Sequence, residues 1–259
     1  MHFSTAVSRQ LLLVLSVAVV TLAFATQARA DNYTALGDSY ASGTGAGGTV
    51  LNSGCDRRVT AYPYLISQSR PNTALTFAAC SGATTSSLLS SQISSVTAST
   101  NLVTVQIGGN DIGFASMIIH CTFGNCTSRL AGVQNTIITT LPSKLDSVYN
   151  QIKSRAPLAR VVAVGYPNPV GTRTCSAALG ISSSEITGIT RVAGVLRDTI
   201  RARATAAGFT FADPIPPFVG HDVCSSTRWL HGFTWGSSSY HPNANGHKLG
   251  LAPLVSPLL

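Results

Sequence analysis

The sequence predicts an α/β fold, in which helices cover both faces of a parallel β-sheet. Short apolar, β-branched segments alternate along the chain with longer segments whose apolar residues recur at helical spacing. Strands and helices that alternate in this way form parallel sheets covered on both sides. Polar or glycine-rich clusters follow the expected strands, and the ligand sites of such sheets lie beyond the carboxyl ends of the strands. The expected strands are Tyr33–Leu36, Leu75–Ala79, Leu102–Ile107, Arg160–Val164 and Phe209–Ala212.

Two segments between these strands have the apolar spacing of long helices. Residues 136–154 are apolar at positions 137, 138, 141, 145, 148 and 152, and residues 183–207 at positions 186, 189, 192, 195, 196 and 200. The second segment begins with Ser182 and has Glu185 three residues later, which is the pattern of a capping box. The Ser/Thr-rich segment 81–100 is expected to hold a short helix and a loop.

Residues 1–30 have the features of a secretory signal peptide. Arg9 precedes a nearly unbroken apolar run from Leu11 to Phe24, and Ala28-Arg29-Ala30 is a small-x-small cleavage site. A membrane anchor is the alternative, but the run is shorter than the roughly 20 residues that span a bilayer. Cleavage after Ala30 leaves residues 31–259, which we expect to form a single domain of a secreted, extracellular protein; two domains are possible but not required.

Charge and cysteine content restrict the classes of partner. Loss of residues 1–30, which contain two arginines and no acidic residue, lowers the net charge from +8 to +6. No run of basic residues marks a nucleic-acid site, so we expect no nucleic-acid partner, whereas contact with anionic lipid surfaces stays open. Nothing demands an oligomer, so a monomer is expected.

All six cysteines follow the signal segment. In an oxidising compartment an even number favours three disulfides, but the sequence alone cannot choose among their pairings. A zinc site is the weaker alternative, because no C-x-x-C occurs and no histidine has zinc-finger spacing.

Ser39 directly follows the first expected strand, at a tight turn with small neighbours. Such a turn exposes a serine hydroxyl, and its backbone amides can stabilise an oxyanion. Residues 43–48 fit G-x-G-x-x-G, but no acidic residue lies about twenty positions further on, so a dinucleotide site is rejected. The elbow pattern G-x-S-x-G is absent because position 41 is alanine, which argues against the standard α/β-hydrolase fold.

A base for Ser39 is expected among the histidines. His241, which lies near the C-terminus before Pro242, is the candidate. His2 lies in the signal segment and His120 beside a cysteine, while the remaining rivals are His221, His231 and His247.

Four sequence blocks together resemble the GDSL esterases and lipases, also called SGNH hydrolases. They are Gly37-Asp38-Ser39, Gly82 after the second strand, Gly108-Gly109-Asn110-Asp111 after the third, and His241-Pro242. The resemblance spans nearly all of residues 31–259, and within the family it is to secreted bacterial lipases and phospholipases. It implies a flavodoxin-like three-layer α/β/α fold with no metal and no cofactor.

The resemblance also implies roles for individual residues. Ser39 would be the nucleophile and His241 the general base, with the Ser39 amide, Gly82 and Asn110 as oxyanion donors. It further implies three sequential disulfides, Cys55–Cys80, Cys121–Cys126 and Cys175–Cys224. Most members have an aspartate three residues before the histidine, where this chain has Ser238. A main-chain carbonyl of Ser239, or of Ser238, is expected to take its place, with Asp213 and Asp222 as the rival groups that could orient His241.

Apolar residues near two of these blocks favour acyl lipids as substrates. They are Phe114, Met117, Ile118 and Ile119, then residues 214–219, and then Trp229, Leu230, Phe233 and Trp235. If a share of them lines the cleft, a lipase or phospholipase A1 that acts on lipid or other ester substrates is expected. A secreted carbohydrate acetylesterase is the enzymatic alternative. A non-catalytic binding module is the alternative from another class, and it would have no need of all four blocks.

Overall fold

The structure, a computed structural model, describes residue 2 and residues 30–259. The expected signal segment 1–30 therefore lies outside the described residues, apart from its residues 2 and 30. Across the part of the chain that is described, no helix is both long and apolar enough to cross a membrane.

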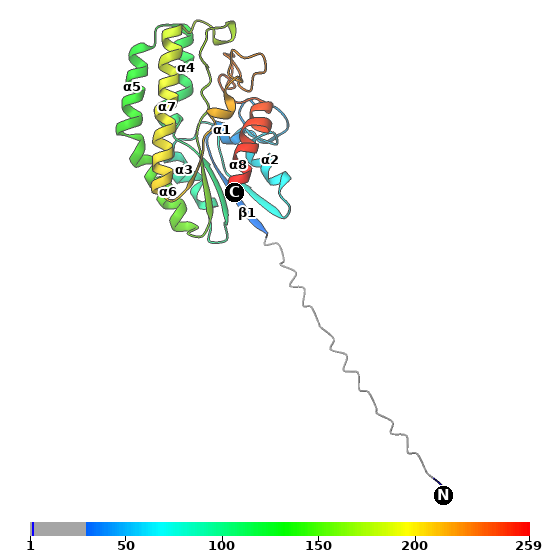
Figure 1. The fold of residues 1–259 in the computed structure, drawn as a ribbon. Coiled ribbons are helices and arrows are strands. Elements are labelled where there is room, and N and C mark those ends of the chain that lie inside the picture. Colours follow the sequence, from blue (N-terminus) through cyan, green and yellow to red (C-terminus); the bar gives the residue numbers. More distant parts are fainter. Residues whose placement is uncertain (1, 3–29) are drawn as a thin grey trace.

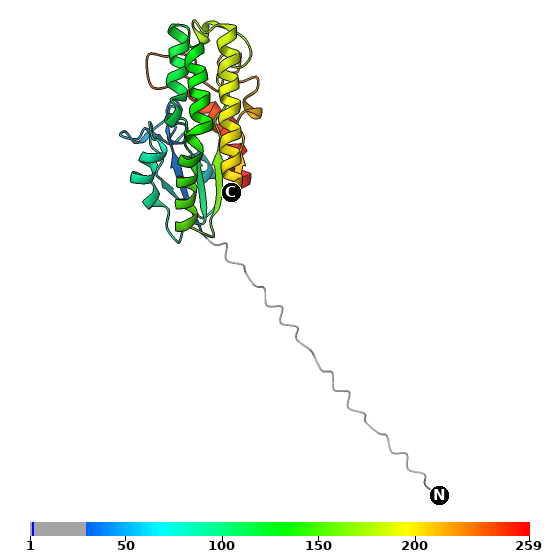
Figure 2. The same ribbon diagram turned by 90° about the vertical axis from the view of Figure 1, so that its left-hand side faces the viewer.

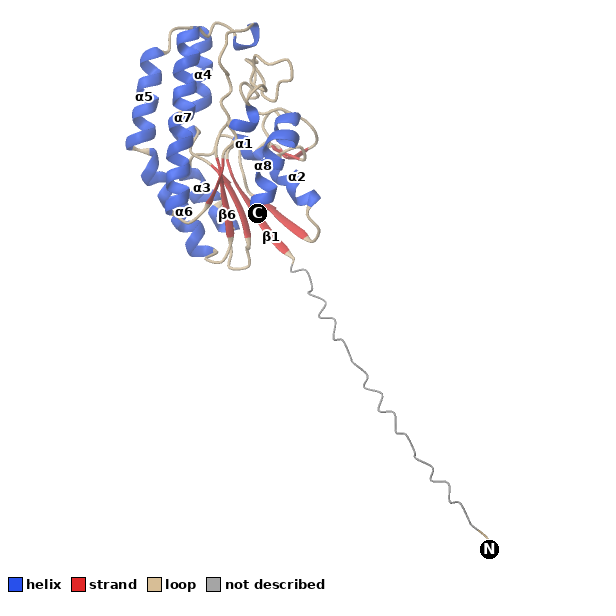
Figure 3. Ribbon diagram, in the orientation of Figure 1, coloured by secondary structure: helices blue, strands red, loops and turns tan. Residues whose placement is uncertain are grey.

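A five-stranded parallel sheet forms the centre of the molecule and confirms the predicted fold class. Its strand order is β4-β1-β5-β6-β7, and each neighbouring pair is parallel. Both faces of the sheet are covered by helices (Figures 1 and 3). The central strands β1, β5 and β6 are almost wholly buried, as expected for strands covered on both sides. The strands are β1 (Asp31–Gly37), β4 (Thr73–Phe77), β5 (Leu102–Gln106), β6 (Arg160–Val164) and β7 (Thr210–Ala212).

Helices α3, α5, α6 and α7 pack together on one side of the sheet, and Figure 2 shows α7 running alongside α5 and α6. Helices α2 and α8 pack against each other on the opposite side. The helices are α1 (Ser39–Ser42), α2 (Tyr62–Ser69), α3 (Thr85–Ser91), α4 (Phe114–Phe123), α5 (Thr127–Thr139), α6 (Leu141–Arg155), α7 (Ser183–Ala206) and α8 (Ala252–Val255). A two-stranded antiparallel ribbon, β2 (Val50–Asn52) with β3 (Arg57–Arg58), lies outside the main sheet.

Two segments differ from the sequence prediction. The helix expected over 136–154 is two helices, since α5 ends at Thr139 and α6 begins at Leu141. Pro142 in the first turn of α6 has no N–H to continue the earlier helix, which explains the break. The strand expected at Leu75–Ala79 lies two residues earlier as β4, because Ala78 and Ala79 both donate to the Ala35 carbonyl and so end the ladder. Helices α1, α2, α4 and α8 had no counterpart in the prediction.

The capping box at the start of α7 is formed as predicted. The Ser182 hydroxyl accepts the Glu185 N–H, and the Glu185 carboxylate accepts the Ser182 N–H. The segment 81–100 holds the short helix α3 and a loop, also as predicted.

Three disulfides tie the loops to this framework. Their pairs are Cys55–Cys80, Cys121–Cys126 and Cys175–Cys224, the pairs that the family resemblance implies. The last closes the longest loop, with a sequence separation of 49 residues, and joins the loops that follow β6 and β7. In the chain-entropy model a loop of that size corresponds to about 4 kcal/mol of stabilisation.

Candidate active site

The turn after β1 places Ser39 at the first position of the short helix α1. Gly37 has φ +148°, and a Cβ there would lie 2.5 Å from the Gln106 carbonyl oxygen, so only glycine fits. The Gln92 side chain accepts the Gly37 N–H and donates to the Gly37 carbonyl, which fixes this buried turn. Asp38 caps α1 by accepting the Tyr40 N–H at 3.0 Å. These bonds fix the backbone that carries Ser39 at the carboxyl end of β1.

His241 and Ser39 are brought together across 202 residues of sequence. The distance from His241 Nε2 to Ser39 Oγ is 2.7 Å. On the other side of the ring, Nδ1 lies 2.9 Å from the Ser239 carbonyl oxygen. A carbonyl can only accept, so Nδ1 carries the proton and Nε2 is free to accept from the serine hydroxyl.

The backbone turn before His241 explains why the Ser239 carbonyl faces the ring. Tyr240, which lies between the two residues, has φ +60°, an unusual value for a bulky side chain. This conformation is held by packing, because Tyr240 is fully buried and its hydroxyl lies 2.8 Å from Thr122 Oγ1. The Ser238 carbonyl accepts the backbone N–H of His241 instead, and the Ser238 hydroxyl lies against Thr234.

Burial keeps His241 neutral at ordinary pH. Loss of solvation lowers the pKa of its imidazole to about 4, and the hydrogen bond to Ser239 only partly opposes this. The nearby His231 lowers the same pKa slightly further. A neutral imidazole that has one nitrogen on a serine hydroxyl can act as a base.

The two other sequence blocks lie beside this pair. Asn110 follows β5 and lines a small cavity with Ser39, and one N–H of its amide donates to the Ala83 carbonyl at 2.9 Å. The second N–H of that amide remains available. Gly82 follows β4 with φ +79°, and the Cys80 N–H, two residues before it, donates to the Gly37 carbonyl at 3.0 Å. Among the hydrogen bonds found within residues 30–259, none uses the backbone N–H of Ser39 or of Gly82.

A buried pair that the sequence reasoning did not single out connects these blocks. Tyr166 lies just after β6. Its hydroxyl donates to Asp38 Oδ2 at 2.5 Å and accepts the Gly109 N–H at 3.0 Å. It therefore links the turn before Ser39 to the turn before Asn110. Burial raises the pKa of the Asp38 carboxyl to about 7, although the Tyr166 hydrogen bond acts in the opposite direction. Tyr166 lies two residues after the end of the buried strand β6, and this position was the available signal.

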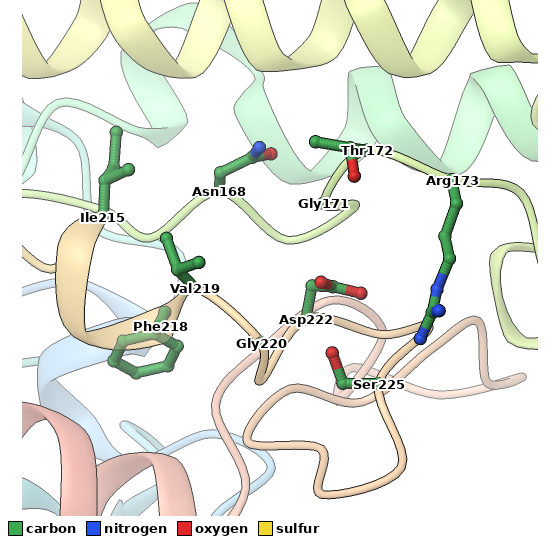
Figure 4. Close-up of a pocket in the computed structure, with 10 residues that line it drawn as sticks. All are labelled: Asn168, Gly171, Thr172, Arg173, Ile215, Phe218, Val219, Gly220, Asp222 and Ser225. Atoms are coloured by element: carbon green, nitrogen blue, oxygen red, sulfur yellow. The ribbon is translucent and has the colours of Figure 1, made fainter.

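Both rival orienting groups are engaged elsewhere. Asp213 pairs with Arg201 at 2.6 Å. Asp222 accepts the Cys224 N–H at 2.7 Å and faces the loop that carries Gly171, in a cavity of about 330 Å³ (Figure 4). None of the four sequence blocks contributes a residue to that cavity.

The rival histidines also have other partners. The ring of His221 stacks on Trp229 with centroids 3.7 Å apart, and Nδ1 of the buried His247 lies 3.2 Å from the Tyr62 nitrogen. His231 contacts the Gly45 carbonyl at 2.8 Å through Nε2. His241 is therefore the histidine whose ring nitrogen reaches Ser39.

Residues 30–259 bring together one group with metal-ligand chemistry, Cys121, Cys126 and Glu185. The two sulfur atoms are joined in a disulfide, and the Glu185 carboxylate accepts hydrogen bonds from Ser182 and from the Cys126 N–H. Because these donor atoms are already used, the group does not fit a metal ion.

The apolar residues expected near the cleft divide into two groups. Met117 and Ile118 are core residues of α4, whereas the buried Phe114 also lines the cavity beside Ser39. Trp235 is almost fully exposed. Part of the apolar sequence near the blocks therefore packs the core, and part lies at the surface.

Comparisons with known proteins show to which family the chain belongs. The sequence model of the GDSL-like lipase/acylhydrolase family matches residues 35–249. Lipase 1 of Streptomyces coelicolor is 42% identical over 240 residues, which are 90% of this chain and 88% of that protein.

Two crystal structures are similar over 89% of this chain and 100% of their own. One is an extracellular lipase from Streptomyces rimosus, with 40% identity and a TM-score of 0.85. The other is phospholipase A1 from Streptomyces albidoflavus, with 39% identity and a TM-score of 0.84. The chain belongs to the GDSL-like lipase/acylhydrolase family and is a carboxylic ester hydrolase.

Proposed function

We propose that residues 31–259 form a single-domain, secreted, monomeric lipase of the phospholipase A1 type that works through a Ser39–His241 dyad. The observation that carries this proposal is the alignment of Ser39 Oγ, the His241 ring and the Ser239 carbonyl, with successive distances of 2.7 and 2.9 Å. The carbonyl holds the ring in the tautomer that a base requires, without an aspartate. The three disulfides support an oxidising destination.

The reaction follows from this geometry in two steps. His241 Nε2 takes the proton of Ser39 Oγ as the oxygen attacks the ester carbonyl carbon. The tetrahedral intermediate then collapses, the alcohol leaves with the proton from His241, and an acyl group remains on Ser39. Water repeats the sequence on the acyl-enzyme, which releases the carboxylic acid and restores both residues.

Three N–H groups are available to stabilise the negative oxygen of each intermediate. They are the free backbone amides of Ser39 and Gly82 and the second N–H of the Asn110 side chain. The Asp38–Tyr166–Gly109 connection holds the two turns in register, so these donors are positioned before the substrate binds.

Lipid substrates are supported by the three similar enzymes and by the apolar surroundings of the site. The Streptomyces relatives are lipases and a phospholipase A1. Phe114 borders Ser39, and the exposed Trp235 lies on the segment that leads to His241. Both features favour an acyl chain over a sugar acetate.

A series of chromogenic esters of increasing acyl length tests the proposal. We expect turnover to increase beyond acetate and to vanish in Ser39→Ala. Ser42→Ala is the matched control, because Ser42 is a buried serine on the same helix whose hydroxyl faces the Ser39 carbonyl and not His241. Hydrolysis of acetate alone would indicate a sugar esterase, and an active Ser39→Ala protein would refute the dyad.

Phosphatidylcholine labelled separately in its two acyl chains tests the phospholipase A1 assignment. We expect release of the sn-1 chain before the sn-2 chain. Release of the sn-2 chain first would contradict this part of the proposal but would leave the dyad unaffected.

A further inference from the structure

Three aromatic side chains gather at the surface next to the dyad. Phe123, Phe233 and Trp235, here called the aromatic cluster, have ring centroids 5.0 to 6.1 Å apart. Trp235 is 91% exposed and Phe123 is 59% exposed. Rings that contact each other and still face solvent form a contiguous apolar patch, and such patches mark interaction sites.

Two independent connections tie this cluster to the catalytic loop. The first connection joins Thr234, the residue before Trp235, to Ser239. The Ser239 hydroxyl accepts the Thr234 N–H at 3.0 Å and donates to the Thr234 carbonyl at 2.7 Å. Ser239 is also the residue whose carbonyl contacts His241.

Phe123 lies at the end of α4, and its neighbour Thr122 contacts the hydroxyl of Tyr240, the residue before His241, at 2.8 Å. The Cys121–Cys126 disulfide closes the turn on the other side of Phe123. Both segments are therefore fixed relative to the dyad.

The charges around the cluster suit an anionic surface. The segment from Ile112 to Leu145, which carries Phe123, contains no acidic residue, and none occurs from Val223 to the C-terminus. Arg129 and Arg228, one on each segment, are exposed and form no ion pair within residues 30–259. Arg228 also shares a surface cavity of about 630 Å³ with Phe233.

Glu185, an acidic residue close to the Cys121–Cys126 turn, leaves this charge distribution unchanged. Glu185 lies beneath the turn, where its buried carboxylate accepts the Cys126 N–H and two bonds from Ser182. The Glu185 carboxylate therefore interacts with donors inside the protein and does not face the aromatic cluster's solvent side.

We propose that the aromatic cluster is a docking surface for a phospholipid bilayer. Trp235 and Phe123 insert at the level of the lipid headgroups, and the docked protein presents the dyad to the lipid. This inference deepens the proposed function and rests on it for its purpose. Tryptophan is favoured at the boundary between hydrocarbon and water, and adjacent cationic side chains add attraction to anionic headgroups. Tight coupling of the Trp235 segment to Ser239 places the docked lipid beside the catalytic loop.

Intrinsic fluorescence offers a direct test, because the chain has two tryptophans. In Trp229→Phe only Trp235 reports, and we expect its emission to shift to the blue on addition of vesicles of equimolar dialkyl-ether phosphatidylcholine and phosphatidylglycerol. These ether lipids contain no carboxylic ester, so binding is measured whether or not Ser39 is the nucleophile. No shift, or a shift that develops with protein concentration in the absence of vesicles, would overturn the proposal, the latter in favour of self-association.

Partitioning of variants onto the same vesicles tests which residues dock. Trp235→Ser and Phe123→Ser should each weaken partitioning about tenfold, since each removes an inserted ring. Leu158→Ser is the matched control: Leu158 is 97% exposed but lies just before β6, at the opposite end of the strands from the dyad. Equal weakening in all three variants would refute a localised docking surface.

Hydrolysis separates docking from recognition of a single acyl chain. Trp235→Ser should lower the rate on ester-phospholipid vesicles by a larger factor than the rate on a soluble short-chain ester. Equal factors would assign the aromatic cluster to a bound acyl chain and overturn the docking role. If the assignment of the Ser39–His241 dyad is wrong, vesicle binding should be unchanged, and Ser39→Ala should hydrolyse esters at the same rate as the parent protein.

Discussion

Replacement of Tyr166 by phenylalanine isolates the buried connection between the two turns of the site. The change removes one oxygen atom that donates to Asp38 at 2.5 Å and accepts from Gly109 at 3.0 Å. The ring itself stays packed, edge-on to Tyr40 with centroids 5.1 Å apart. The loss is therefore one of hydrogen bonds and not of core volume.

The two lost bonds allow the magnitude to be worked out. The buried Gly109 N–H is left without a partner, which costs about 1–3 kcal/mol. The bond to Asp38 is worth about 1 kcal/mol when the carboxyl is neutral and about 1.5–3 kcal/mol when it is ionised. We therefore expect the free energy of unfolding to fall by roughly 2–4 kcal/mol in acid and roughly 2.5–6 kcal/mol in alkali.

The direction of the pH dependence follows from the pKa of Asp38. Burial raises that pKa from 3.8 to about 7 in the native state, so the parent protein loses stability as pH rises through this range. Tyr166 favours the ionised carboxyl, and its removal raises the pKa further. The variant should therefore lose more stability than the parent as pH rises, and the difference between them should grow.

Urea unfolding of both proteins at about pH 5 and about pH 9 measures this difference. Tyr62→Phe is the matched control, because the buried Tyr62 hydroxyl has no hydrogen-bond partner within residues 30–259 and its removal should cost little. A loss in Tyr166→Phe that is the same at both pH values, or no larger than that of the control, would refute the reasoning.

Three further predictions concern the dyad and its surroundings. Asp213→Asn and Asp222→Asn should each keep kcat within a few-fold of the parent, because both carboxylates are engaged away from His241, and a loss near 10⁴ in steady-state assays would reveal a conventional triad. Asn110→Ala should lower kcat by about 10² to 10³ with the melting temperature nearly unchanged, and an unaltered kcat would remove it from the oxyanion site. Burial lowers the pKa of His241 to about 4 and of His247 to about 3, so the unfolded state binds more protons below about pH 6.5. Each histidine should therefore lower the unfolding free energy by up to about 1.4 kcal/mol per pH unit as pH drops from there, while the raised pKa of Asp38 acts in the opposite direction over the same range. The net unfolding free energy should still fall between pH 6 and 4, and a flat or rising profile would contradict at least one of the two histidine shifts.

Local sequence predicted most of the elements, although not all of their limits. The strand expected at Arg160–Val164 has those limits in the structure, and α7 begins after the predicted capping box. The helix expected over 136–154 was wrong at its start, because the apolar spacing continues across the break at Thr140 and does not reveal it. Helix α4 was missed because most of its side chains are apolar, so its few polar positions give only a weak helical period.

What the sequence by itself determined was the set of reactive residue types and their place after strands. Ser39, Gly82 and Asn110 each follow a parallel strand, and the carboxyl ends of β1, β4 and β5 meet because these strands are neighbours in the sheet. The sequence could not give that strand order, since β1 lies between β4 and β5 only through pairing across many residues.

Only the tertiary structure decided how His241 is held. Its loop follows no strand and has no period, so its position depends on the contact between Tyr240 and Thr122, which are 118 residues apart. The positive φ of Tyr240 turns the Ser239 carbonyl, and not that of Ser238, toward the ring. The contact between Asp38 and Tyr166, which are 128 residues apart in sequence, also depends on tertiary packing. Residue spacing carries information about neighbours in the chain, whereas these contacts arise from the packing of segments that the chain does not connect locally.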